Sequence, residues 1–344
     1  MGLREYVLKR IVYSFVLIIF VITLNFIIFE MMPGNPAEYF VNPIRLGQRE
    51  RIAALEKQWG LTDPLYVRYA RYVVNLFTWQ FGDSFTTGSP VLPEMVMRIP
   101  YTLVLLGGSA AIAMVIGILL GILAAHKRGG KFDTTAVTVS LTTYSLPTFW
   151  IGMLLLLIFY STLQWFPGAG AYPREWVLPG RWPAPTAVFN VFGTTITIPG
   201  WADIAARLQY ATLPLLTLIL FHYGGWLLLT RATMIETLTE DYVTTARAKG
   251  LKERTVLMKH ALKNASLPLI TSAALTFGFI LSGAIITESV FTWPGLGGWI
   301  WQAIQIKDYP VLQAIFYVIG LCVIVANFIA DLLYGVIDPR IKYG

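Results

Sequence analysis

Six long apolar stretches constrain this sequence more than any other feature. A helix needs about 20 mostly apolar residues to cross the hydrocarbon core of a bilayer. Each stretch is about that long or longer: residues 11–32, 103–125, 136–163, 211–230, 267–287 and 311–330. The last five contain no Asp, Glu, Lys or Arg, and the first contains only Glu30. The sequence therefore predicts an all-α membrane protein with six transmembrane helices.

The composition excludes the common alternatives. Of the 344 residues, 56% are hydrophobic and 13% are charged, about half the charged share of a soluble domain. A disulfide scaffold is excluded because Cys322 is the single cysteine. The first stretch is longer than the apolar region of a signal peptide, and no small-x-small cleavage site follows it. We therefore expect it to be retained as a transmembrane helix.

The basic residues set the orientation. With the N-terminus inside, the cytoplasmic segments are 1–10, 126–133, 231–266 and 338–344. These 61 residues hold 15 of the 26 Lys and Arg residues, more than three times the density of the other side. Cytoplasmic loops carry such an excess. We therefore predict a multi-pass membrane protein with both termini in the cytoplasm. The net charge of +7 reflects this topology rather than affinity for nucleic acid.

Three regions are expected along the chain. Residues 1–32 form the N-terminus and first span, and residues 33–99 form an extracytoplasmic region with helical stretches at 48–59 and 64–76. Residues 100–344 form a core of five helices. This core contains an extracytoplasmic insert, 161–210, and a cytoplasmic loop, 231–266. The alternating residues Thr194–Ile198 suggest one arm of a β-hairpin within the insert.

The cytoplasmic loop carries the most specific pattern. A short helix through Ala248 should end at Gly250, the residue type that commonly follows a helix, and a second helix should begin near Leu251. Pro268 should mark the entry to the fifth span. Such a pair of helices either lies on the lipid headgroups or docks to a cytoplasmic partner. The residues alone leave both readings open.

The segment Tyr242–Leu251 resembles the EAA loop of ABC importer permeases. The Glu-Ala-Ala positions of that motif correspond to Thr244, Thr245 and Ala246 in this chain. The motif glycine corresponds to Gly250, and the closing Leu-Pro corresponds to Leu267-Pro268. Thr244 departs from the motif Glu, so a salt bridge from that position is not expected. The gap from Gly250 to Pro268 is longer than in the general pattern, as in the dipeptide/oligopeptide subgroup.

The resemblance extends along nearly the whole chain, to the oligopeptide permease B subunit. The segments that carry it are 6–37, 60–65, 81–85, 145–150, 288–297, 308–314 and 338–342. It implies the type I ABC importer permease fold and a location in the cytoplasmic (inner) membrane of a prokaryote. It also implies that this chain forms half of a pathway that transports di- or oligopeptides. The implied partners are a second homologous permease, two ATP-binding subunits, an extracytoplasmic solute-binding protein and the lipid bilayer.

The resemblance also implies where the ATPases touch this chain. The loop is the coupling element of the family, and the residues expected to make the contact are Tyr242, Thr245, Ala246, Ala248, Gly250 and Leu251. The chain itself is not expected to be an enzyme. The run Lys127–Phe132 lacks the first glycine of a phosphate-binding loop, and the His residues have no metal-ligand spacing. No cofactor or metal is therefore expected in this chain, and ATP and Mg²⁺ should bind the partner ATPases.

Outside the loop, three residues are candidates for the pathway or its gate. Glu288 should lie at the outer end of the fifth span, where a carboxylate near lipid favours a structural or gating role. Pro147 should kink the third span near Trp150. That kink is either a hinge or a fixed feature of the packing, and the sequence does not separate the two.

The insert is rich in aromatic residues. We expect them either to pack a small external subdomain or to contact the solute-binding protein, because aromatic residues are favoured anchors at protein interfaces. The candidates for that contact are Tyr172, Trp176, Trp182 and Phe189.

Other functions remain open at this stage. Within the same class of importer, the substrate is a peptide, an oligosaccharide or nickel. A secondary transporter driven by protons or sodium would need carboxylates near the bilayer midplane, and the second to sixth stretches have none. A membrane scaffold or the subunit of a membrane enzyme is the third class.

Overall fold

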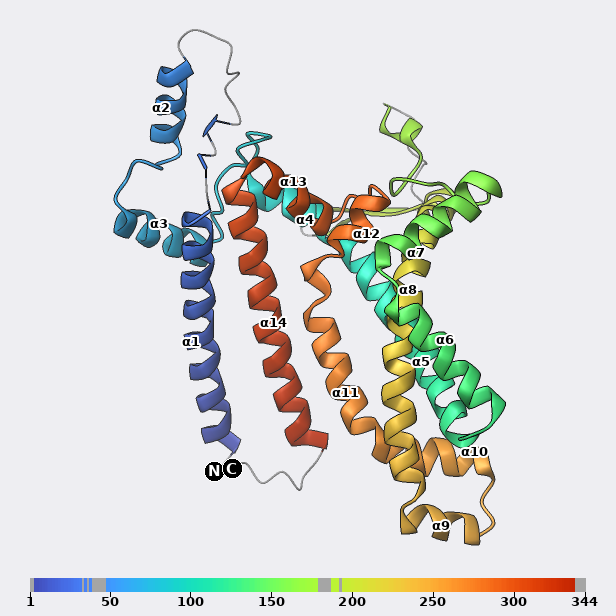
Figure 1. Cartoon of the computed structure of the whole chain (residues 1–344). Helices are drawn as coiled ribbons and strands as arrows, with labels where there is room; N and C mark the ends of the chain where they lie inside the picture. The colour runs from blue at the N-terminus through green and yellow to red at the C-terminus, as the bar shows by residue number, and fades with distance from the viewer. Residues whose placement is uncertain are drawn as a thin grey trace. The chain divides into compact units, whose positions relative to one another are not determined.

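The computed structural model describes residues 3–32, 34–35, 37–38, 48–178, 187–191 and 194–337, and it is mostly helical (Figure 1). Among these residues, five helices are long and apolar enough to cross a membrane, and the number is six if a bent pair of helices counts as one span. The predicted all-α architecture is confirmed. The described chain forms two compact units: residues 1–100, 281–283 and 295–344 make unit 1, and residues 101–280 and 284–294 make unit 2.

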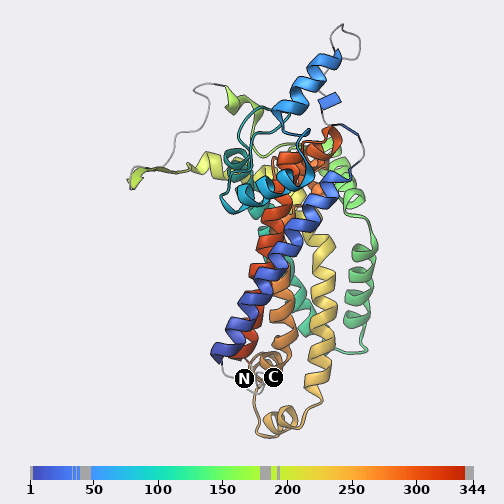
Figure 2. The ribbon, with the colours of Figure 1, turned by 90° about the vertical axis from the view of Figure 1, so that its left-hand side faces the viewer.

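Unit 1 combines the beginning and the end of the chain. Its helices are α1 (Leu3–Glu30), α2 (Gln48–Gln58), α3 (Leu65–Phe77), most of α4 (Val91–Thr102), α13 (Leu296–Ile306) and α14 (Tyr309–Ile337). The helical stretches expected at 48–59 and 64–76 are thus confirmed as α2 and α3. Helices α1 and α14 run side by side (Figures 1 and 2). Gly320 permits this close approach, because a Cβ atom there would lie 2.9 Å from the Val21 side chain.

Asp308 fastens the start of α14 to the segment that follows α3. Its buried carboxylate accepts hydrogen bonds from the Ser84 hydroxyl at 2.5 Å and from the backbone N–H groups of Phe85 and Thr86 at 3.0 and 3.1 Å. The Phe85 ring stacks on Trp59 with centroids 3.9 Å apart. A buried carboxylate is tolerated when hydrogen bonds satisfy it, so these residues form one fixed cluster.

Unit 2 holds the middle of the chain. Its main helices are α5 (Gly108–His126), α6 (Lys131–Ser145), α7 (Thr148–Leu155), α8 (Trp201–Leu238), α9 (Asp241–Ala248), α10 (Glu253–Thr255), α11 (Leu262–Gly278) and α12 (Ile285–Val290). Short π-helical segments, Leu103–Gly107, Leu156–Thr162 and Val256–Ala261, and 3₁₀ turns at Arg174–Val177 and Ile280–Ser282 extend or join these helices. Strands β1 (Ala187–Val191) and β2 (Thr194–Ile198) pair antiparallel, which confirms the predicted hairpin arm.

Glycines set the closest helix contact in unit 2, between α5 and α8. A Cβ atom at Gly117 would lie 2.4 Å from Trp226 Cβ, and one at Gly121 would lie 2.6 Å from Thr230 Cβ. Small residues four apart let two helix backbones approach closely, a common device inside membranes where burial alone does not drive association. Tyr223 and Leu227 of α8 pack with Ala113 of α5 in the same contact.

The structure corrects two of the predicted spans. The stretch 136–163 was expected to be one kinked helix. It is instead two helices, Lys131–Ser145 and Thr148–Thr162, at 99° to each other. The expectation for 267–287 was wrong at its C-terminal end. The helical run already begins at Glu253 and passes through Pro268, and it ends at Ser282 before the separate helix α12.

Candidate functional site

A helix–turn–helix follows the end of α8 and carries the residues singled out from the sequence (Figure 1). Helix α9 begins at Asp241 and ends at Ala248, and its end at Ala248 was predicted. Val243 and Ala246 on its inner face are buried, and they pack against Val256 from the following helical run and against Leu238 from α8. This small apolar cluster fixes α9 against its own chain, so α9 does not depend on a partner for its position.

Gly250 makes the turn between the two helices. Its φ of +75° lies in the left-handed region that favours glycine. The Gly250 N–H donates to the Arg247 carbonyl at 2.9 Å, and the Leu251 N–H donates to the Ala246 carbonyl at 3.4 Å. This pair of bonds is the Schellman motif, which satisfies the last carbonyls of a helix. A Cβ atom at Gly250 would meet nothing within 4 Å. The glycine is therefore required by backbone conformation and not by crowding within the chain.

A carboxylate bridges the turn. Glu253, the first residue of α10, accepts hydrogen bonds from Arg247 Nη2 at 2.8 Å and from Arg247 Nε at 3.3 Å. His126 Nδ1, in the last turn of α5, lies 3.6 Å from the same carboxylate. The carboxylate raises the pKa of Arg247 above its usual value. Three segments, α9, α10 and α5, thus converge on Glu253.

The second helix of the pair is continuous with the fifth span. Its inner residues Leu257, Ala261 and Ala265 are buried against Ile122 of α5 and Met234 of α8. The run from Glu253 to Ser282 is one long helical segment, so a helix connects the turn to the interior of unit 2. The arrangement can therefore carry a movement at the turn into the helices of unit 2.

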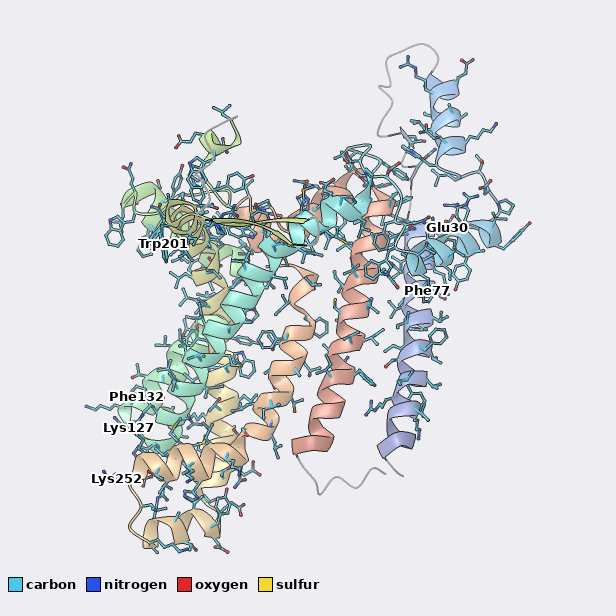
Figure 3. All side chains as sticks on the ribbon, turned by 180° about the vertical axis from the view of Figure 1, so that it is seen from behind. Glu30, Phe77, Lys127, Phe132, Trp201 and Lys252 are labelled. Carbon is cyan, nitrogen blue, oxygen red and sulfur yellow. The ribbon has the colours of Figure 1, made fainter. Side chains whose placement is uncertain are left out.

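The predicted coupling residues fall on different faces. Tyr242 and Leu251 are 38% and 40% exposed, and Thr245, Ala248 and Gly250 are exposed as well. Ala246 is buried inside the apolar cluster instead. Lys252, labelled in Figure 3, is also exposed beside the turn. The open surface around Gly250 thus consists mainly of small or polar side chains, together with the larger apolar side chains of Tyr242 and Leu251.

The break at Pro147 is a complete interruption of the helix. Leu146 and Pro147 have ψ angles of 138° and 137°, which are extended. A residue before proline disfavours the helical region, and this explains the stop after Ser145. Trp150 lies in the first turn of α7, where its N–H bonds to the Pro147 carbonyl, and its side chain is exposed. Gly152 and Ile151 on the other side pack near Phe291.

Glu288 lies in α12 and not in the fifth span, so its expected place at the outer end of that span was wrong. It is fully buried. Its Oε1 accepts from the Thr102 hydroxyl at 3.3 Å and from the Ala284 N–H at 3.4 Å. The nearby Trp293 indole donates to the Tyr101 carbonyl at 3.0 Å. Glu288 therefore joins α12 to the helical run through Thr102.

The aromatic insert is described in part. Tyr172 is half-buried and packs against a cluster that includes Leu105, Ala211 and Trp293. Trp176 is half-buried in a short 3₁₀ turn. Phe189 lies in β1, and Trp182 lies outside the described residues. Within the described part of the chain, no three His, Cys, Asp or Glu side chains are placed to hold a metal ion.

The sequence reasoning missed four residues that hold the turn in place: Arg247, Glu253, His126 and Val243. One signal was available: Arg247 and Glu253 flank Gly250 symmetrically, with opposite charges on the two sides of a predicted turn. The sequence held no such signal for His126, because its approach to Glu253 depends on how α5 packs against the loop. The burial of Val243 and Ala246 similarly needs the position of Val256.

Comparison with known proteins places these features in a family. Residues 3–106 match the N-terminal component and residues 117–343 the main component of the family described as binding-protein-dependent transport system inner membrane component. The di/tripeptide transport system permease protein DppB of Pseudomonas aeruginosa is 37% identical over 93% of both chains. The probable D,D-dipeptide transport system permease protein DdpB of Escherichia coli is 38% identical over 94% of this chain and 93% of its own.

A third relative and a solved structure are also similar to this chain. The oligopeptide transport system permease protein AppB of Bacillus subtilis is 34% identical over 99% of this chain and 100% of its own. A chain of the MetNI methionine ABC transporter in an inward-facing conformation superposes with a TM-score of 0.54 at 15% identity, covering 72% of this chain and 97% of that one. This likeness supports the expected permease fold. The protein belongs to the family of binding-protein-dependent transport system inner membrane components.

Proposed function

We propose that this chain is the permease subunit of an ABC importer for di- and oligopeptides and forms half of the translocation pathway. The relatives named above are dipeptide or oligopeptide transport permeases, and each aligns over more than nine-tenths of this chain. The proposed partners are a second homologous permease, two ATP-binding subunits and an extracytoplasmic solute-binding protein. ATP and Mg²⁺ bind the ATP-binding subunits.

One observation supports the coupling role: the helix–turn–helix is packed against the rest of its own chain. Helix α9 is held from inside by Val243 and Ala246 and is left open around Gly250. In the proposed cycle the ATPases close on ATP and push this surface, and the run Glu253–Ser282 carries the displacement into the bundle. Tyr242, Thr245, Ala248, Gly250 and Leu251 make the contact. Ala246, the sixth residue expected there, supports it from beneath.

The same proposal fixes the orientation and the organisation. Both termini and the loop 231–266 face the cytoplasm of an inner membrane, and 33–99 and 161–210 face outward. Residues 1–32 and 100–344 then contain the six spans. The loop 231–266 carries seven of the chain's 26 Lys and Arg residues, which supports this orientation through the positive-inside rule.

The remaining candidates take narrower roles. Glu288 holds α12 at the outer part of unit 2 through Thr102, so it stabilises a gate and does not bind substrate. Pro147 and Trp150 shape the corner between α6 and α7. Tyr172 packs against the cluster of Leu105, Ala211 and Trp293. The solute-binding protein contacts the insert at Trp176, Trp182 and Phe189.

The Gly250→Trp variant tests the coupling contact. Tryptophan in a left-handed position at the centre of the open surface should abolish peptide-stimulated ATP hydrolysis and uptake, while the complex still assembles. Gly129→Trp is the matched control, because Gly129 has a φ of +76° and equally open surroundings in another turn, Lys127–Gly130. If Gly250→Trp transports as the unchanged protein does, the coupling surface is misassigned.

Co-purification tests the rest of the assembly. A tagged form of this chain, extracted from native membranes in mild detergent, should bring with it a second permease and ATP-binding subunits. Mass spectrometry of ligand released from the associated solute-binding protein should identify peptides. An oligosaccharide or nickel would replace the peptide assignment, and the absence of ATP-binding subunits would contradict the importer.

A further inference from the structure

Helix α3 of unit 1 has three distinct faces. At ~100° per residue, residues of different character fall into separate sectors of its 13-residue length. The first face consists of Tyr69, Tyr72 and Leu76, the second of Arg68, Arg71 and Asn75, and the third of Tyr66, Ala70, Val74 and Phe77. An amphipathic helix with one buried face needs only two sectors. The third, apolar and exposed, is therefore unexplained by packing within the chain.

The first face docks onto α1. The Tyr69 hydroxyl lies 2.7 Å from Thr23 Oγ1, and Asn25 Nδ2 donates to the Tyr72 hydroxyl at 2.9 Å. The Phe26 ring meets the Tyr69 ring edge-on with centroids 5.2 Å apart. These contacts fix the rotation of α3 about its own axis, and with it the directions of the other two faces.

The second face points toward the Glu30 end of α1. Arg68 Nη1 lies 2.6 Å from Glu30 Oε1. Glu30 is seven residues beyond Thr23, roughly 10 Å further along the helix at 1.5 Å per residue. Arg68, Arg71 and Asn75 also line a cavity of about 560 Å³ together with Trp59 and Phe85. The polar side of α3 therefore faces away from the apolar length of α1.

The third face points in the other direction, along the membrane-spanning part of α1. Tyr66, Val74 and Phe77 are 76%, 59% and 45% exposed. At the same level of α1, between Thr23 and Glu30, the side chains of Leu24, Ile27 and Ile28 are exposed too. These exposed side chains belong to α1, a candidate membrane span, so they form part of the surface that a bilayer would cover. In Figures 1 and 3, α3 lies across the end of α1, with Phe77 at the end of α3 that is nearer α1.

We propose that α3 is an interfacial helix that lies in the headgroup region and buries Tyr66, Ala70, Val74 and Phe77 in the lipid. Helices of this kind sink an apolar face ~5–10 Å into the boundary between headgroups and acyl chains. Tyr66 and the exposed Trp79 are residue types that gather at this depth. The lipid contact of α3 is continuous with that of α1. Its assignment to the extracytoplasmic leaflet follows from the orientation proposed above, but the lipid contact itself does not depend on transport.

Spin labels on α3 test this directly. Because Cys322 is the only cysteine, a Cys322→Ser background accepts single labels at Tyr66→Cys, Val74→Cys and Phe77→Cys. Arg71→Cys and Asn75→Cys on the polar face are the matched controls. The full chain in nanodiscs of phosphatidylcholine and phosphatidylglycerol is exposed to oxygen, which concentrates in lipid, and to a nickel chelate, which stays in water.

The expected result is a ratio of oxygen to nickel-chelate collisions several-fold higher at positions 66, 74 and 77 than at positions 71 and 75. Equal ratios on both faces would place the third face in water and overturn the proposal. Low collision rates with both reagents at 66, 74 and 77 would show that a protein surface covers them, which overturns it as well. Ala70→Cys replaces any labelled variant of this face that fails to fold.

Discussion

Glu253 shows how one half-exposed carboxylate positions a surface without adding much stability. It pairs with Arg247 across the Gly250 turn and approaches His126 on α5. Exposed ion pairs contribute about 0–1 kcal/mol, so their loss should not unfold the protein. What the pairs fix is the angle between α9 and the helical run that follows it.

Replacing Glu253 should therefore impair coupling while leaving the fold intact. We expect Glu253→Gln to lower the peptide uptake per ATP hydrolysed several-fold in proteoliposomes, with an unchanged melting temperature. Glu236→Gln removes an exposed carboxylate from the nearby end of α8 and should change nothing.

Exchanging the two charges tests whether Glu253 acts by positioning α9 through its pair with Arg247 or only by supporting the fold in general. The double variant Arg247→Glu, Glu253→Arg restores the pair with reversed polarity and should recover much of the lost coupling. Failure of the exchange, together with full activity of Glu253→Gln, would show that the bridge has no part in coupling.

Gly121 illustrates a residue whose identity is set by a single close contact. The Cβ of an alanine there would lie 2.6 Å from Thr230 Cβ and 2.7 Å from the Leu227 carbonyl oxygen, so α5 and α8 would have to separate. Overpacking of this kind costs about 1–3 kcal/mol. We expect Gly121→Ala to lower the melting temperature of the detergent-solubilised protein.

The same substitution at Gly225 is the control. Gly225 lies on α8, and a Cβ atom there would meet nothing within 4 Å. Because alanine favours a helix over glycine, Gly225→Ala should be neutral or slightly stabilising. Equal losses at both positions would mean that close packing at Gly121 does not limit stability.

At the scale of elements, the corner between α6 and α7 is better explained as a fixed bend than as a hinge. Ile151 and Leu155 of α7 are buried with Leu213 and Phe291, so α7 is clamped on the side away from Trp150. A Cβ at Gly152 would come within 3.2 Å of the Phe291 ring. Rotation about the Leu146–Pro147 link would have to break this packing.

Distance measurements between spin labels test the fixed bend. Labels at Leu141→Cys on α6 and Met153→Cys on α7, both exposed positions, in the Cys322→Ser background should give one distance. That distance should be the same in the nucleotide-free complex and in the complex trapped with ATP. A second distance that appears with ATP would make the corner a hinge and return Pro147 to the gate.

The elements also show which features a sequence predicts well. The apolar stretches, α2, α3, the end of α9 and the strand Thr194–Ile198 depend on local patterns, namely length, periodicity and Gly250, and all were predicted. The 99° bend was underestimated because a proline predicts a stop but not a direction. The end of the fifth span was placed too far along because 279–287 contains no charged residue. A 3₁₀ turn and Ala284, which is not helical, end the helix before that.

For the whole molecule, the sequence could not show which distant residues meet. Asp308 bonds to Ser84 and Thr86, more than 220 positions earlier, and Glu288 bonds to Thr102. Both acids were visible in the sequence, yet their roles as anchors depend on packing. Ala246 is the sharpest case: its small side chain suggested an open contact, and the structure buries it beneath α9.

At the scale of the whole molecule, the chain's proposed role is to import peptides, with the energy supplied by ATP that partner subunits bind. The most direct measurement is uptake of a radiolabelled dipeptide into proteoliposomes that contain the purified complex, with ATP on the ATPase side and the solute-binding protein on the other. Uptake should require both ATP and the binding protein, and it should be indifferent to ion gradients. Uptake driven by a proton or sodium gradient without ATP would contradict it.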